Sequence, residues 1–251
     1  MDTTDGTTDD TTDDALATRA VDDLLATLDL EAIDRDLYRG ANPDTWPGDR
    51  VFGGLVAAQA LRAAIGTVEV AHAVHSFHSY FVRPGRLSLP ILYSVERIRD
   101  GRSFTTRRVT AIQQGEAIFT MDASFHRQDE EGVDYQLPVA PGTPGPDSPA
   151  ARSGGRFPEG MARPELFAAF DTRELGPTPP EADGTYRSTR RAWIRTTAPL
   201  PDDPAVHACV LTFVSDMAVI LAVRPPDPAA PWAAFMGARL DHAVWFHRPV
   251  R

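Results

Sequence analysis

Asp216 is the acidic residue whose position most clearly suggests chemistry. It lies in the segment Asp202 to Val223, where apolar residues recur with the spacing of a helix. Asp216 follows Phe213 by three residues and precedes Ile220 by four, so the predicted helix carries all three on one apolar face. A carboxylate there is costly unless it is paired or reactive, and a reactive one would activate a water molecule. The alternative is an Asp at a helix kink, bonded to a nearby backbone N–H group.

Two adjacent glycines, Gly53 and Gly54, precede a nearly uninterrupted apolar run from Leu55 to Ile65. The run predicts a buried helix, and glycines at its start let a ligand approach the backbone closely. The free N–H groups of a helix start attract negative charge or a polarised carbonyl oxygen. The pair therefore indicates a substrate-binding position, although a tight turn before a core helix would also explain it.

The other candidates are histidines and one further carboxylate. Asp241 and His242 are neighbours on a predicted strand, and His75 and His78 lie on another. By strand alternation, the two members of each pair point to opposite faces and cannot share a pocket. The seven histidines show no ligand spacing, and no HExxH, GxSxG, GxGxxG or P-loop motif is present, so we expect no metal site.

Composition narrows the range of partners. The chain has 251 residues, of which 42% are hydrophobic, enough for one sizeable core or two small ones. A net charge of -10 argues against nucleic acid. No apolar run approaches the roughly 20 residues that span a bilayer, and the N-terminus does not resemble a signal peptide. Cys209 is the single cysteine, which excludes an internal disulfide and predicts a cytoplasmic protein.

The elements that must position these residues follow from periodicity and turn signals. Helices are predicted over 15–30, 55–65, 161–170 and 202–223, and strands over 31–40, 71–82, 89–97, 104–113, 117–126, 186–197 and 237–248. An Asp-Gly pair at 100–101 predicts a hairpin and hence an antiparallel sheet that curls around the first apolar helix. Residues 1–14 are expected to be a disordered acidic tail, and 131–184 a Pro- and Gly-rich linker.

A short internal repeat indicates that one module is used twice. Two adjacent aromatic residues, a spacer and Arg-Pro occur in Ser79–Pro84 and again in Val244–Pro249, each time after a strand and a helix. The modules are predicted at 15–130 and 185–251. Because the second copy stops at Arg251, we expect it to lack most of its sheet and to leave its last strand unpaired. Either the chain is then a fragment, or another subunit completes the sheet of the second module, or the second module is degenerate.

Six blocks in order resemble the acyl-CoA thioesterase II family: VFGGLVAAQAL, VHSFHSYFVRPG, VERIRDGRSFTTRRVTAIQQGEAIFTMDASF, AWIRTTAPLPDD, FVSDMAV and LDHAVWFHRP. The resemblance implies an α+β double hot-dog fold, in which each module is a curved antiparallel sheet around a central helix, with the second module incomplete. It also implies hydrolysis of fatty acyl-CoA thioesters to free acid and CoA, without metal or cofactor, by a homo-oligomer.

The resemblance also assigns the site. The family's water-activating Asp matches Asp216, while its Thr or Ser position falls on Arg239 and its Gln would lie beyond Arg251. Leu55 stands where many members have Gln. Arg239 has no acceptor and cannot replace a hydroxyl, so we assign it to substrate binding instead. The alternative is a catalytically inactive acyl-CoA-binding or scaffold protein. A hot-dog dehydratase is a weaker third option, because the acid and His arrangement that is usual in dehydratases is not visible in this sequence.

Overall fold

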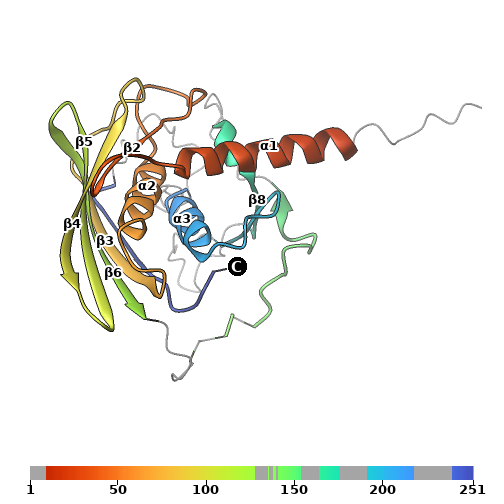
Figure 1. Ribbon diagram of the computed structural model, residues 1–251. Coiled ribbons are helices and arrows are strands. Elements are labelled where there is room, and N and C mark those ends of the chain that lie inside the picture. Colours follow the sequence, from red (N-terminus) through yellow and green to blue (C-terminus); the bar gives the residue numbers. More distant parts are fainter. Residues whose placement is uncertain are drawn as a thin grey trace, which may run out of the picture.

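The computed structural model describes residues 10–127, 135, 138–139, 141–153, 164–175, 191–217 and 239–250. They form a curved antiparallel sheet with two helices side by side on its inner face, and a smaller second sheet (Figure 1). None of the described helices is long and apolar enough to cross a membrane.

Within the described residues the larger sheet has seven strands, in the order β1-β2-β4-β5-β6-β3-β10. They are β1 (Glu31–Asp34), β2 (Leu37–Gly40), β3 (His72–Phe81), β4 (Ile91–Asp100), β5 (Phe104–Gln113), β6 (Glu116–Arg127) and β10 (Asp241–Trp245). All pairs are antiparallel, as predicted. The predicted strand 31–40 is two strands instead, because Asp36 turns the chain with a φ of 58°.

Alternation along the strands decides which face of the sheet is buried. In β5 the buried residues are Thr105, Arg107, Val109, Ala111 and Gln113. Gln114 and Gly115 connect β5 to β6 with φ values of 52° and 81°, the positive angles that a tight hairpin requires. Every second residue of these strands therefore points from the inner face of the sheet toward the helices.

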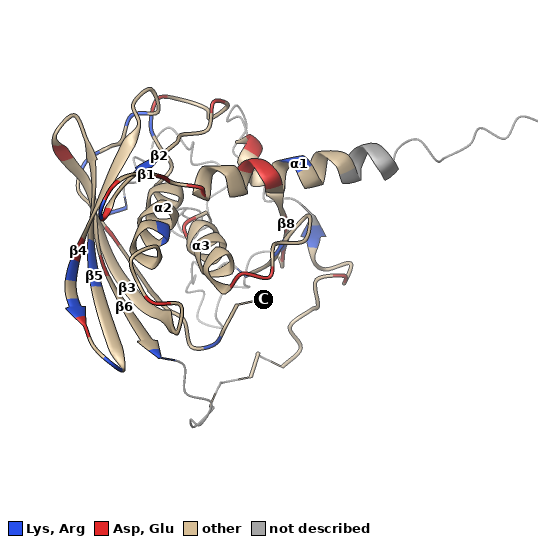
Figure 2. Ribbon diagram, viewed as in Figure 1, with Lys and Arg blue, Asp and Glu red and all other residues tan. Residues whose placement is uncertain are grey.

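The helix α2 (Gly53–Ile65) lies against this inner face and is buried almost throughout. In Figure 2 it is tan except for one basic segment, whereas β4 and β5 carry many charges. Its buried Gln59 is fully used: the amide donates to the carbonyls of Thr27 at 2.6 Å and Ala41 at 2.8 Å, and accepts from the Tyr93 hydroxyl at 2.6 Å. A polar residue in the core is tolerated because each of these groups has a partner.

The helix α3 (Pro204–Ser215) packs beside α2 (Figure 1). Asp203 caps it by accepting from the Ala205 N–H at 2.8 Å, with proline at the first position. The predicted helix over 202–223 is wrong at its end, since α3 stops at Ser215 and a turn follows. Residues 218–223 lie outside the described part.

The repeated motif becomes a pair of neighbouring strands. β3, which follows α2, pairs antiparallel with β10, which follows the α3 segment. Under the repeat, Tyr80 corresponds to Trp245 and Ser76 to Asp241, and the register pairs Tyr80 with Asp241 and Trp245 with Ser76. His78 and Ala243, which correspond under the repeat, are paired directly with each other, and the residue pairs on either side of them are exchanged symmetrically. Two copies related by a two-fold axis require this pattern.

The last strand, β10, was expected to be unpaired, but it is paired along one of its two edges. β10 pairs with β3 of the first module, which makes one sheet run across both copies. Among the described residues no strand covers its other edge. The strand expected over 237–248 is limited to Asp241–Trp245, and residues 237–238 lie outside the described part.

The predicted linker 131–184 contains regular structure. It holds β7 (Arg152–Ser153), the 3₁₀ helix η1 (Glu165–Ala169) and β8 (Phe170–Glu174), and β8 pairs with β9 (Ala192–Thr196) in a second sheet. Composition could not show this, because β8 is a strand through its pairing with distant β9. The helix expected over 161–170 is the short η1, and the strand expected over 186–197 is β9; residues 161–163 and 186–190 lie outside the described part.

The first helix, α1 (Asp10–Leu28), begins earlier than the predicted 15–30 and enters the segment expected to be a tail. Its Val21, Leu24 and Leu28 are buried and belong to the same core as α2 and α3. Residues 1–9 lie outside the described part.

Candidate active site

Asp216 lies in the turn immediately after α3 and is buried, with 1% of its surface exposed. Its own N–H donates to the Phe213 carbonyl at 3.3 Å. The expected burial is confirmed, although Asp216 terminates the helix instead of lying within it. A carboxylate removed from water in this way must be held by hydrogen bonds or charge.

The two groups that hold Asp216 come from distant parts of the chain. The Gly54 N–H, at the start of α2, donates to its carboxylate. Arg239 Nη1 donates to Oδ2 at 2.5 Å and forms an ion pair whose side chains are 21% and 1% exposed. The predicted attraction of negative charge to the start of α2 is thus seen, with Asp216 as the charged group.

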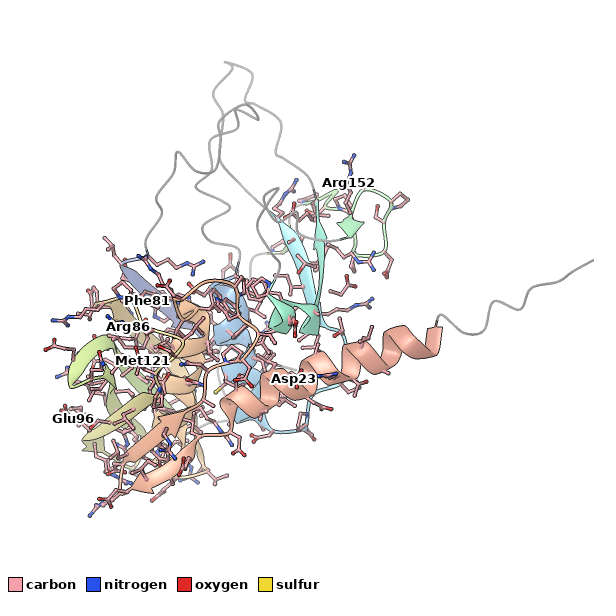
Figure 3. All side chains as sticks on the ribbon, turned by 90° about the horizontal axis from the view of Figure 1, so that it is seen from above. Asp23, Phe81, Arg86, Glu96, Met121 and Arg152 are labelled. Carbon is pink, nitrogen blue, oxygen red and sulfur yellow. The ribbon has the colours of Figure 1, made fainter. Side chains whose placement is uncertain are left out.

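Gly53 lies against the same carboxylate. A Cβ at this position would stand 2.9 Å from Asp216 Oδ2 and 2.7 Å from the ring of Phe81. Phe81 is the last residue of β3 (Figure 3). At Gly54, a Cβ would stand 2.6 Å from the Phe213 carbonyl oxygen. Both glycines are therefore required for close approach of α2 to the end of α3, rather than for turning the chain.

The structure thus brings together the four residues that the sequence analysis assigned to catalysis or substrate binding: Asp216, Gly53, Gly54 and Arg239. Leu55, where the family often has Gln, is fully buried in the core. Which of the four act on a substrate stays a prediction.

Burial dominates the electrostatics of the pair. It raises the pKa of Asp216 from 3.8 to about 6, against the opposing effects of Arg239 and the Gly54 N–H. Burial likewise lowers the pKa of Arg239, while the Asp216 carboxylate raises it. An acid with a pKa near 6 is largely ionised at pH 7 and yet basic enough to accept a proton from water.

An aromatic cluster forms the wall beside Arg239. The guanidinium lies 5.6 Å from the centre of the Phe52 ring, within range of a cation–π contact. Phe52 in turn packs on Trp46, Phe167 and Phe213, with ring centres 5.1–5.4 Å apart. Sequence reasoning missed this wall; the Phe immediately before the glycine pair was its only local signal.

His242 is close to the site, and its neighbour Asp241 is not. His242 faces the helices and its Nε2 lies 3.2 Å from the Ser215 hydroxyl, one residue before Asp216. Asp241 is exposed on the other face of β10, which confirms that the two point apart. Burial and Arg239 lower the pKa of His242, against Asp241, which raises it.

The prediction that His75 and His78 lie on opposite faces is wrong. His75 Nε2 lies 2.7 Å from the Ser124 hydroxyl and its ring packs on His126, on the outer face of β6. His78 is exposed on the same outer face, against Trp245. A β-bulge at His75 shifts the alternation by one residue, which sequence spacing alone does not reveal.

Other reactive groups are poorly placed. Burial raises the pKa of the Cys209 thiol to about 12, so it is not a thiolate nucleophile at neutral pH. In the part of the chain that the structure describes, no three His, Cys, Asp or Glu side chains converge as a metal site would need. The described site can therefore offer a carboxylate base, an arginine and backbone N–H groups.

Family models match both halves of the chain. "Acyl-CoA thioesterase N-terminal domain" matches residues 42–126, and "Acyl-CoA thioesterase" matches residues 169–251. Acyl-coenzyme A thioesterase 8 of Homo sapiens is 33% identical over 241 residues, which cover 89% of this chain and 74% of that protein. Acyl-CoA thioesterase 2 of Haemophilus influenzae is 33% identical, with 91% and 82% covered.

Solved structures agree. An acyl-CoA thioesterase II from Mycobacterium marinum matches with a TM-score of 0.66 and 35% identity, over 90% of this chain and 78% of that one. A tesB protein of Mycobacterium avium subs paratuberculosis matches with a TM-score of 0.71 and 30% identity, over 92% and 81%. A hot-dog protein from Alicyclobacillus acidocaldarius, at 21% identity, TM-score 0.60 and 75% and 68% coverage, supports the fold alone. The α+β double hot-dog fold is confirmed, and the chain belongs to the acyl-CoA thioesterase family.

Proposed function

We propose that the chain hydrolyses acyl-CoA thioesters and that Asp216 activates the attacking water. The observation that carries the proposal is a buried carboxylate with a pKa of about 6, held between the Gly54 N–H and Arg239. This arrangement keeps a base ionised near neutral pH in a site that excludes bulk water. Membership of the acyl-CoA thioesterase family supports the substrate class.

In the reaction, Asp216 accepts a proton from water as the water oxygen bonds to the thioester carbonyl carbon. The carbon–sulfur bond then breaks and the CoA thiolate leaves, taking the proton that Asp216 received. Water and acyl-CoA thus become a free acid and CoA, with no other reactant. Charge that develops on the carbonyl oxygen would be stabilised by the guanidinium of Arg239, whose Nε has no hydrogen-bond partner among the described residues.

Arg239 is the departure from the family pattern that this chain must accommodate. Its guanidinium already donates to Asp216, which favours the ionised carboxylate but also competes for the oxygen that would bind water. A catalytically inactive acyl-CoA-binding protein, in which that ion pair never opens, is the outcome opposite to our proposal.

The experiment is release of free thiol from acyl-CoA substrates of increasing chain length. Asp216→Asn keeps the shape and removes the base, so kcat should fall by about 100-fold or more. The matched control is Asp241→Asn, an exposed carboxylate on β10 whose loss should leave kcat unchanged. Wild-type turnover that survives in Asp216→Asn would remove Asp216 from the mechanism. Thermal stabilisation by acyl-CoA with no turnover in wild type would establish the binding protein instead.

We also propose that the chain acts as a homo-oligomer in the cytoplasm, with modules at 15–130 and 185–251. Exposed aromatic residues on the outer face of the sheet, Tyr80, Phe104 and Trp245, support assembly. The single, buried cysteine is compatible with a reducing compartment. Light scattering on the purified protein tests the assembly, and a monomer at micromolar concentration would contradict it.

A further inference from the structure

His242 is a partly buried titratable residue that the proposed reaction leaves unused. It lies on β10 opposite Ser79, whose hydroxyl donates to the His242 carbonyl at 2.8 Å. Its ring meets the edge of Phe77 at 5.6 Å and Ser215 on its other side. The imidazole is therefore fixed between β3 and the last residue of α3, beside Asp216.

The hydrogen bonds of Ser215 determine which ring nitrogen carries the proton. The Ser215 hydroxyl donates its one hydrogen to the Thr212 carbonyl at 2.8 Å. Its oxygen can then only accept from His242, so Nε2 must be the protonated nitrogen. Burial and the nearby Arg239 lower the pKa of His242, which keeps the ring neutral at pH 7 despite Asp241. In that neutral ring Nδ1 is a bare acceptor.

Nδ1 of His242 is buried and has no hydrogen-bond partner among the described residues. Nε of Arg239, three residues earlier in the chain, is likewise buried and has no hydrogen-bond partner among the described residues. The site thus holds one unused acceptor and one unused donor, both out of contact with solvent. Buried polar atoms in native proteins are seldom left unpaired, and each exception calls for an explanation such as a catalytic role or a bound water. A group with a carbonyl and an N–H, or a water molecule, complements this pair.

We propose that His242 Nδ1 accepts a hydrogen bond from an N–H or O–H donor present in the substrate complex. Two sources have this chemistry: an amide of the pantetheine arm of acyl-CoA, and the attacking water. His242 would thereby orient the thioester or the water relative to Asp216. The inference rests on the proposed function, because it takes the substrate class from it.

Two substitutions separate this role from the contact with Ser215. His242→Asn places an amide oxygen near the position of Nδ1 and gives up the donor to Ser215, whereas His242→Gln places an amide near Nε2 and gives up the Nδ1 acceptor. We expect His242→Gln to lower kcat/KM about 3- to 10-fold, the value of one hydrogen bond, and His242→Asn to stay within about threefold of wild type. Ser215→Ala is the control for the other contact and should also stay within about threefold of wild type. Wild-type kcat/KM in His242→Gln, or an equal loss in His242→Asn, would overturn the proposal.

The source of the donor is distinguished by the substrate. If it is the pantetheine amide, His242→Gln should be impaired with acyl-CoA but not with the same acyl group on a simple alkanethiol that has no amide. If it is the attacking water, both substrates should suffer equally. Each pattern supports an acceptor at Nδ1 and names what binds to it.

Nitrogen-15 NMR of histidine-labelled wild-type protein tests the inference without turnover or mutation. The His242 signals should show a bare Nδ1 and a protonated Nε2, and the Nδ1 signal should move when a non-hydrolysable acyl-CoA thioether is added if the amide is the donor. A protonated Nδ1 in the free protein would refute the proposal. A protein that binds the thioether in this way and yet hydrolyses no thioester would refute the proposed function alone.

Discussion

Replacing Arg239 with Gln should move the acid limb of the pH–rate profile to higher pH. Arg239 is the single full positive charge that contacts Asp216 among the described residues, with Nη1 at 2.5 Å from Oδ2. It opposes the burial that raises the pKa of Asp216 to about 6. Without it, the ionised carboxylate loses its counter-charge while staying buried, so its pKa must rise further.

The size of the shift follows from the geometry. Two unit charges with centres about 4 Å apart interact by about 4 kcal/mol at an effective dielectric constant of about 20, equivalent to about 3 pKa units. The Arg239 side chain is 21% exposed, so solvent screens part of this energy. We therefore expect a rise of about 1–3 units. At pH 7 the ionised fraction of Asp216 would fall from about nine-tenths to a half or less.

The assay is kcat/KM for one acyl-CoA between pH 5 and 10, since this ratio reports ionisations of the free enzyme. Wild type should lose activity below about pH 6, and Arg239→Gln below a pH between about 7 and 9. Arg83→Gln is the matched control, because Arg83 pairs with exposed Glu116 at 3.1 Å and does not contact Asp216. An acid limb that stays in place or moves to lower pH in Arg239→Gln would refute the electrostatic account.

Two further predictions concern the same carboxylate. Gly53→Ala should lower kcat and destabilise the fold by about 1–3 kcal/mol, because the new methyl group would press on Asp216 and Phe81. Thiol release measures the change in kcat and chemical denaturation measures the change in stability. An unchanged variant would show that the start of α2 is not packed tightly against Asp216 and Phe81. The pKa of Asp216 is higher in the folded protein, about 6, than in the unfolded chain, so the folded state binds more protons between these values and stability falls as pH rises through them. Relative to Asp216→Asn, which does not titrate, the free energy of unfolding of wild type should fall by about 2 kcal/mol from pH 4 to 7, as measured by urea titration, and a constant difference would mean that the pKa is not raised.

The sequence alone was sufficient for features that depend on neighbouring residues. The alternation in β6, the hairpin turns and the apolar run of α2 are local patterns, and the structure confirms them. Asp216 could be selected for the same reason, since helical spacing already put a carboxylate among apolar residues. The order of the family's blocks then identified the fold.

Features that depend on long-range packing needed the tertiary structure. The contact of Arg239 with Asp216 and of Gly54 with the same carboxylate joins three segments that no periodicity connects. The bulge that brings His75 to the outer face, and the partner strand that makes β8 part of a sheet, are likewise set by pairing with distant residues.

Sequence therefore determined which side chains are available, and tertiary structure decided their state. Asp216 has its raised pKa because packing of α3 against α2 removes it from water, and this burial outweighs the opposing charge of Arg239, which folding also brings to it. The free energy of a charge depends on the solvent and charges within a few ångströms of it in space. Those surroundings are assembled by folding and are not encoded by spacing along the chain.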